Sequence, residues 1–208
     1  MGSDVCFGVA DAALSCWVVI PVKPPPDRKS RLARALGPDE RNDLVRRMAT
    51  HVARAAAMTP GIDSVAFIAS CTTGLPPEVP ILADRGGGLN GALTGALADL
   101  AARGATRAII VAGDLPLVTP DELAPLVTAG AIMIAPDRHG TGTNAISLPL
   151  PAAGGFTFAF GPDSFALHRA ESDRLGIEAI ELRRDGLARD VDEPGDLDDA
   201  ADLLGAAN

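Results

Sequence analysis

The chain has 208 residues, a length typical of one domain. A composition that is 47% hydrophobic and 22% charged excludes a disordered chain and favours a globular one. The formal net charge of −9 argues against binding to nucleic acid or to an anionic membrane, because both need a basic surface. An anionic small substrate is compatible with this charge only where basic residues gather locally or a metal ion intervenes.

The cysteines and the N-terminal residues indicate the compartment. Cys6, Cys16 and Cys71 form no CxxC pair, a pattern that fits a reducing environment better than a disulfide scaffold. No apolar stretch approaches the ~18 residues of a membrane span, and no Lys or Arg precedes Lys23, unlike a secretory signal. We therefore expect a cytoplasmic protein with a loose leader over 1–15 and a single domain over 16–208.

Apolar runs alternate with helical periodicity along the chain. Strands are expected at 17–22, 65–69, 108–112 and 132–134, with weaker signals at 145–148 and 177–180. Helices are expected from Gly37-Pro38, after Gly86-Gly87-Gly88, from a capping box at Thr119–Glu122, and over 163–175 and 196–204. The alternation predicts an α/β fold with a mostly parallel central sheet and helices on both faces.

Ligands of such sheets bind beyond the carboxyl ends of the strands. Four basic residues, Lys23, Arg28, Lys29 and Arg31, follow the first expected strand and form a local trap for anions such as phosphate. The alternative is a solvated loop. Gly86-Gly87-Gly88, before a helix, leaves backbone N–H groups free for a phosphate, ribose or base, although it matches neither GxGxxG nor the P-loop and could be only a flexible loop.

Three carboxylates are candidates for a divalent cation. Asp114 follows a central apolar strand, where sheet enzymes place Mg²⁺ ligands, although a lone Asp there more often caps a turn. Asp190 and Asp192, if they lie on a strand, point to the same side and repel unless a cation or a proton lies between them. Asp192 is also a candidate cap for the helix begun by Glu193-Pro194.

Thr143 and the segment 160–164 form a further candidate site. The segment predicts a loop entering a helix, whose first N–H groups hold an anion or are simply capped by Asp163 or Ser164. His51, His139 and His168 lack metal-ligand spacing, and no Gly-x-Ser-x-Gly elbow supports acyl transfer.

In this order the motifs resemble the phospholactate/phosphoenolpyruvate guanylyltransferases of deazaflavin coenzyme F420 biosynthesis. The resemblance runs from about Trp17 to Leu204 and is carried by Pro21-Val22-Lys23, Lys29-Ser30-Arg31-Leu32, Asp84 with Gly86-Gly87-Gly88-Leu89-Asn90, Asp114-Leu115-Pro116, Gly142-Thr143-Asn144, Phe160-Gly161-Pro162 with Ser164, and Asp190-Val191-Asp192. The leader and Pro24-Pro25-Pro26 depart from the family pattern.

The resemblance implies a nucleotide-diphospho-sugar-transferase-like fold and an enzyme that joins GTP to a three-carbon phospho-acid and releases diphosphate. It implies Mg²⁺ held by Asp114, Asp190 and Asp192, a triphosphate facing Lys23, Lys29 and Arg31, an acceptor acid bound by Thr143, Gly161 and Ser164, and a guanosine near Gly87, Gly88 and Asn90. Phosphoenolpyruvate, 2-phospho-L-lactate and 3-phospho-D-glycerate all remain open as acceptors, and so does a homo-oligomer.

The chemistry agrees with this inventory. The acceptor phosphate is already an oxyanion, so the reaction needs cations and positioning more than a strong base. Two alternatives stay open: a non-catalytic GTP-binding module, which has no need of three convergent carboxylates, and a cytidylyl- or molybdopterin-guanylyl-type transferase. The latter enzymes open with a glycine-rich loop where this chain has Val22-Lys23-Pro24.

Overall fold

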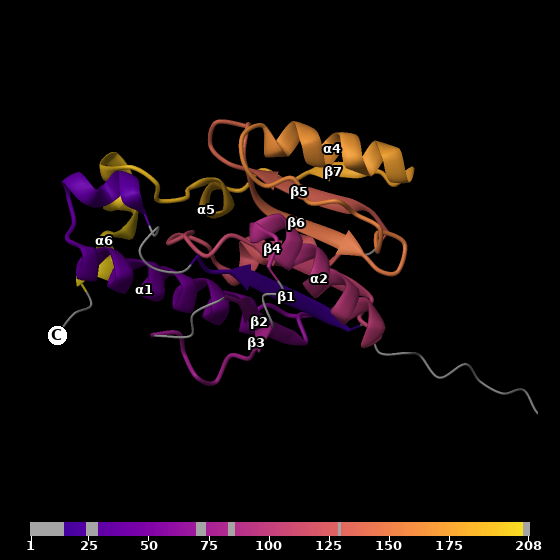
Figure 1. Ribbon diagram of the computed structural model, residues 1–208, viewed down its shortest axis with the longest axis horizontal. Coiled ribbons are helices and arrows are strands. Elements are labelled where there is room, and N and C mark those ends of the chain that lie inside the picture. Colours follow the sequence, from indigo (N-terminus) through magenta and orange to yellow (C-terminus); the bar gives the residue numbers. More distant parts are fainter. Residues whose placement is uncertain (1–14, 24–28, 70–73, 83–85, 129, 206–208) are drawn as a thin grey trace, which may run out of the picture.

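The computed structural model describes residues 15–23, 29–69, 74–82, 86–128 and 130–205. Within them, seven strands form one sheet in the order β3-β2-β1-β4-β6-β5-β7 (Figure 1). The strands are β1 (Cys16–Pro21), β2 (Ser64–Ile68), β3 (Ile81–Leu82), β4 (Arg107–Val111), β5 (Ile132–Pro136), β6 (Thr143–Pro149) and β7 (Ala179–Glu181). The expected leader and Pro24-Pro25-Pro26 lie outside the described residues, apart from Ser15.

The expectation of a mostly parallel sheet is confirmed. Neighbouring strands pair in parallel except where β6 lies between β4 and β5, to both of which it is antiparallel. β6 reverses direction because only six residues, 137–142, connect it to β5, too few for a crossover. The weaker strand signals at 145–148 and 177–180 correspond to β6 and β7, whereas the two-residue β3 was not predicted.

Helices cover both faces of the sheet, as predicted (Figure 1). Residues of β1 alternate between the two layers, so that Val18 and Ile20 pack with α1 while Val19 packs with α2. The helices are α1 (Pro38–Ala57), α2 (Gly88–Ala102), α3 (Pro120–Leu123), α4 (Ser164–Leu175), α5 (Asp185–Ala188) and α6 (Ala201–Gly205), with 3-10 turns η1 (Ser30–Arg34), η2 (Ala124–Val127) and η3 (Pro194–Ala200). None of these helices has the length and apolar character needed to span a membrane.

Three local predictions are wrong. Thr119 is the N-cap of α3, as expected, but the predicted capping box does not form: the Thr119 side chain makes no capping bond, and Glu122 Oε1 accepts the N–H of Gly186, 64 residues away, at 3.0 Å. Asp190 and Asp192 lie on irregular chain rather than on a strand. The segment predicted as one helix over 196–204 is a 3-10 turn followed by a short α-helix, and Glu193, not Asp192, is its N-cap.

The glycine triplet adopts a backbone that other residues rarely use. Gly86, Gly87 and Gly88 have φ values of 85°, 82° and 70°, in the left-handed region where a Cβ is strained. All three are exposed, and Gly87 is the N-cap of α2. The predicted helix start at the triplet is confirmed, and the exposed backbone of Gly87 and Gly88 lies at the N-terminus of α2.

Candidate functional site

One lysine joins two carboxylates that are far apart in the sequence. The Lys29 ammonium donates to Asp114, at the carboxyl end of β4, and to Asp192 Oδ1 at 2.8 Å. Arg31 NH1 lies 3.7 Å from the other oxygen of Asp192. Only 9% of the Lys29 side chain is exposed, so the two acids give a nearly buried cation its counter-charges.

The ion pairs that Lys29 forms with Asp114 and Asp192 determine the pKa shifts in this cluster. Burial alone would lower the pKa of Lys29, but the charges of Asp114 and Asp192 outweigh it and the pKa is raised. Burial likewise opposes ionisation of Asp192, yet Lys29 and Arg31 hold the pKa of that carboxyl below its usual value. We therefore expect Lys29 and Asp192 both to be charged at neutral pH.

The pKa of Asp190 is shifted in the opposite direction from that of Asp192. Burial and the nearby charge of Asp114 raise its pKa, against a hydrogen bond from Asn144 Nδ2 to Asp190 Oδ1 at 3.2 Å. The same amide donates to the carbonyl of Leu187 at 3.0 Å, so Asn144 fixes the chain that carries Asp190. A carboxylate with a raised pKa beside another carboxylate is one that an added cation would stabilise.

Backbone contacts hold the two acidic segments together. The N–H of Val191 donates to the carbonyl of Asp114 at 3.2 Å, and Val191 itself is fully buried. Arg138 donates to the carbonyl of Asp190, and its NH1 lies 3.0 Å from Asp196 Oδ1. The segment 190–192 thus presents its carboxylates next to β4 without being a strand.

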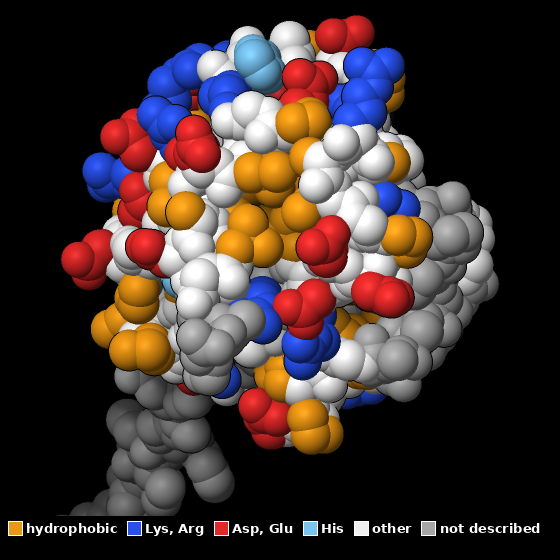
Figure 2. All heavy atoms as spheres, turned by 90° about the vertical axis from the view of Figure 1, so that its left-hand side faces the viewer, with side chains coloured by type: hydrophobic (Ala, Val, Ile, Leu, Met, Phe, Trp, Pro, Cys, Tyr) orange, Lys and Arg blue, Asp and Glu red, His pale blue; other side chains and the backbone are white. Residues whose placement is uncertain are grey.

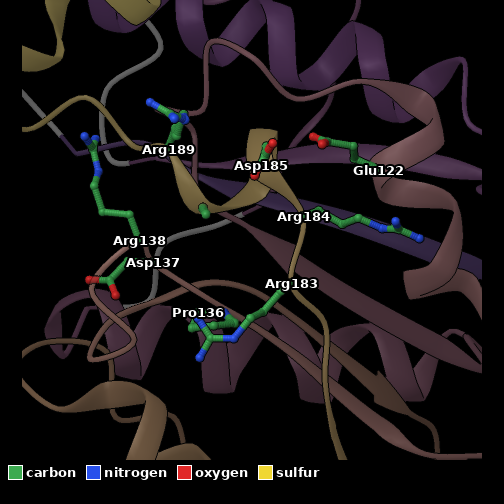
Figure 3. Close-up of a pocket in the computed structure, with 9 residues that line it drawn as sticks. Glu122, Pro136, Asp137, Arg138, Arg183, Arg184, Asp185 and Arg189 are labelled. Carbon is green, nitrogen blue, oxygen red and sulfur yellow. The ribbon is translucent and has the colours of Figure 1, made fainter.

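Arg138 also borders a pocket of about 580 Å³ (Figure 3). The pocket is rich in arginines and acids and is lined by Glu122, Pro136, Asp137, Arg138, Arg183, Arg184, Asp185, Ala188 and Arg189. Basic and acidic side chains also lie side by side on the face that carries α6 and the start of α1 (Figure 2). On this face, among the residues that the structure describes, basic side chains therefore lie beside acidic ones.

Thr143 and Ser164 meet at a buried histidine. Ser164 Oγ donates to Thr143 Oγ1 at 3.3 Å, and His168 Nδ1 lies 3.0 Å from the same oxygen. His168 Nε2 accepts the N–H of Ala159 at 3.0 Å. The imidazole is fully buried, and desolvation lowers its pKa to about 4.

The buried imidazole predicts a loss of stability in acid. His168 takes up a proton less readily in the folded chain, where its pKa is about 4, than in the unfolded chain, where it is 6.5. Its contribution to the free energy of unfolding is therefore complete above pH 6.5 and is lost as the pH falls toward 4. Between pH 7 and 4.5 this amounts to about 2–3 kcal/mol. Urea unfolding of the native chain and of His168→Gln should show a shallower decline for the variant, and equal declines would contradict the assignment.

Asn90 links the glycine loop to the segment after Phe158. Its Oδ1 accepts the N–H of Phe160 at 2.8 Å, and its Nδ2 donates to the carbonyl of Phe160 at 3.2 Å. The side chain is thereby used within the protein, which leaves the backbone of Gly87 and Gly88 as the part of this loop that faces outward. Gly161, with φ 136°, follows Phe160 directly and is exposed.

The structure thus gathers the predicted residues into two groups. Lys29, Arg31, Asp114, Asp190 and Asp192 form the charged group, while Thr143, Ser164, Gly161, Asn90 and the glycine loop form the second. Lys23 is exposed and contributes to the field at Asp192, and Arg28 and Asp84 lie outside the described residues. Sequence reasoning gave no role to Asn144, Arg138 or His168; the spacing of Ser164 and His168, one helical turn apart, was a signal for the last.

The donor set suits a hard divalent cation. Asp114 and Asp192 already share one cation, the Lys29 ammonium, while burial and the charge of Asp114 raise the pKa of Asp190. Among the residues that the structure describes, no three Asp, Glu, His or Cys side chains are grouped as a ready metal site. The side chains fit Mg²⁺ in chemistry, and the metal role of the three acids stays a prediction.

An α/β sheet with acids and a buried lysine at its carboxyl edge and a glycine loop opening a helix defines the class of nucleotidyltransferase-like folds. A Desulfovibrio desulfuricans G20 protein provisionally classed as a nucleotide-diphospho-sugar transferase shares this fold, with a TM-score of 0.73, 18% identity and coverage of 88% of this chain and 85% of that one. Residues 16–202 match the family described as guanylyl transferase CofC like, and the chain belongs to that family.

Curated relatives agree with the family. A phosphoenolpyruvate guanylyltransferase of Sphaerobacter thermophilus is 40% identical over 195 residues, which are 88% of this chain and 91% of the relative. A 2-phospho-L-lactate guanylyltransferase of Halorubrum lacusprofundi is 37% identical over 180 residues, covering 85% of this chain and 78% of the relative. The resemblance seen in the sequence is thereby confirmed.

Proposed function

We propose that this protein transfers GMP from GTP to the phosphate of a three-carbon phospho-acid and releases diphosphate, as a cytoplasmic step of coenzyme F420 biosynthesis. The acceptor is phosphoenolpyruvate or a close analogue, 2-phospho-L-lactate or 3-phospho-D-glycerate. The observation that carries the proposal is the cluster of Lys29 with Asp114 and Asp192, beside Asp190, at the carboxyl edge of the sheet.

The charged group would bind the phosphates of GTP and the metal ion. Lys23, Lys29 and Arg31 would face the triphosphate, and the backbone of Gly87 and Gly88 would lie along the guanosine. Asp114, Asp190 and Asp192 would hold Mg²⁺, which when bound supplies positive charge against the departing diphosphate. Lys29 would hold Asp114 and Asp192 in place by pairing with both carboxylates.

The second group would position the acceptor. Thr143, Ser164 and the N–H of Gly161 would hold the acid so that one phosphate oxygen lies in line with the α-phosphorus of GTP. Because that oxygen is already negatively charged, no side chain has to remove a proton from it. His168 is a weak base, because its pKa is lowered to about 4, and both of its ring nitrogens are already hydrogen-bonded within the protein.

A diphosphate-release assay tests the proposal. The native chain with GTP, Mg²⁺ and each of the three phospho-acids is expected to release diphosphate with at least one of them, and to stop when EDTA is added. Replacing GTP by CTP, ATP or UTP should lower the rate strongly. Tight GTP binding with no diphosphate from any acceptor would refute the enzyme and favour a binding module.

A further inference from the structure

The hydrogen-bond inventory around Thr143 has one donor left over. Thr143 is the first residue of β6, only 7% exposed, and its hydroxyl has one proton to donate and two lone pairs to accept with. Ser164 Oγ–H uses one lone pair. What happens at the other depends on which nitrogen of His168 carries the proton.

The protein environment settles the tautomer of His168. A backbone N–H can only donate, so Nε2, which accepts the N–H of Ala159 at 3.0 Å, must be unprotonated. A neutral imidazole then has its proton on Nδ1. Nδ1–H therefore donates to Thr143 Oγ1, 3.0 Å away, and takes the second lone pair.

Because His168 Nδ1–H donates to Thr143 Oγ1, the Thr143 proton must point away from His168, and with Ser164 Oγ as the donor of its pair it points away from Ser164 as well. None of the described residues is seen to accept it. A donor left available beside the Gly161 turn has the polarity to meet an anionic oxygen of a ligand. The same imidazole also fixes Ala159, two residues before Gly161, so one side chain orients both halves of this group.

We propose that His168 is a positioning residue for the acceptor: its Nδ1–H tautomer turns the Thr143 hydroxyl toward the bound phospho-acid while its Nε2 anchors the chain that leads to Gly161. The proposal rests on the proposed function, because it assumes that Thr143 contacts the acceptor. His168 itself touches neither substrate.

Packing explains how the imidazole stays in this orientation. Phe160 contacts the ring edge-to-face with centroids 4.8 Å apart, and Phe156 and Phe158 lie at 5.7 Å and 6.4 Å. A ring enclosed by aromatic side chains and bonded at both nitrogens has one rotamer and one tautomer available. A purely structural histidine would need the same packing, so the test must separate the two nitrogens.

Two amide substitutions at His168 separate the roles of its two ring nitrogens. In His168→Asn the short side chain can place an amide N–H near the position of Nδ1, whereas in His168→Gln the longer one can place its oxygen near the position of Nε2. Both lose the ring and should lower the melting temperature similarly. We expect His168→Gln to raise the KM for the acceptor roughly tenfold or more, with the KM for GTP within about twofold of native, and His168→Asn to have the smaller effect.

Two further variants complete the comparison. Thr143→Val removes the hydroxyl, and adding His168→Gln to it should raise the acceptor KM no further, since the group that His168 orients is gone. His51→Gln is the control, because His51 lies on α1 and its Nε2 is 2.9 Å from the carbonyl of Val118 rather than from Thr143. Its kinetic constants should match the native ones.

The tautomer is measured independently of activity. Nitrogen-15 chemical shifts of the His168 ring at pH 7 should show a protonated Nδ1 and an unprotonated Nε2. A protonated Nε2, or equal acceptor KM values for native, His168→Asn and His168→Gln chains, would overturn the inference while leaving a working transferase. No turnover by the native chain would overturn the proposed function and this inference with it.

Discussion

Asp114→Asn is expected to abolish turnover while leaving the fold intact. The substitution removes one charge from the group of Asp114, Asp190 and Asp192 that would hold the cation opposite the triphosphate. The loss should be several kcal/mol of transition-state stabilisation, so that kcat falls by about two to three orders of magnitude. The amide oxygen can still accept from Lys29, which keeps its second partner Asp192, so folding is not expected to fail.

The measurement is diphosphate release at saturating GTP and acceptor, with thermal unfolding recorded on the same samples. Asp121→Asn is the matched control, because Asp121 is an exposed acid in the first turn of α3 with the same change in net charge. It should keep the native rate. If Asp114→Asn retains more than about a tenth of the native kcat, Asp114 has no metal role.

The framework of the fold was predictable because its signals are local. The apolar run 108–112 reads as a buried strand from its own residues, and β4 is buried at every position. The reversal of β6 was not predictable, since it depends on where a six-residue connection sends the chain rather than on the composition of β6. The capping box at Thr119 is incomplete for the same reason, since its expected partner Glu122 accepts a hydrogen bond from the distant Gly186 instead.

The same distinction between local signals and tertiary contacts applies to the site. Candidate residues could be identified one by one, because charge and glycine at the ends of strands are visible in the sequence. Their pairing could not: Lys29 meets Asp114 across 85 positions and Asp192 across 163. The sequence argument therefore assigned Lys29 to the triphosphate alone and overlooked that, in the folded chain, its ammonium already neutralises two of the predicted metal ligands.

That double engagement makes Lys29→Met the second substitution with a large expected effect. Met replaces the four-atom apolar stem of the side chain without its terminal nitrogen and makes the same demand on the left-handed backbone at position 29, where φ is 50°, so the variant isolates the ammonium. Without it a cation is lost from the expected triphosphate site, and Asp114 and Asp192 lose the positive charge that they share, although Arg31 and Lys23 still act on Asp192. We expect kcat/KM for GTP to fall about 100-fold or more.

Stability should fall as well, by about 1–2 kcal/mol, because Lys29 is nearly buried but its partners are 27% and 49% exposed and partly screened by solvent. The pH dependence identifies the source. Lys29 lowers the pKa of Asp192, so this stabilisation is present above the ordinary aspartate value of 3.8 and is lost as the pH falls below it. The stability difference between native and variant chains should therefore narrow in acid.

Lys29→Arg is the companion variant, since it keeps the charge and changes the geometry. A guanidinium should retain most of the stability but place its charge differently toward GTP, so its kcat/KM should lie between those of the native and Met chains. Native kinetics in Lys29→Met would remove Lys29 from the site. If Lys29→Met keeps the native stability but loses activity, the ion pairs of Lys29 serve catalysis alone. The ammonium between Asp114 and Asp192 would then add nothing to the free energy of unfolding.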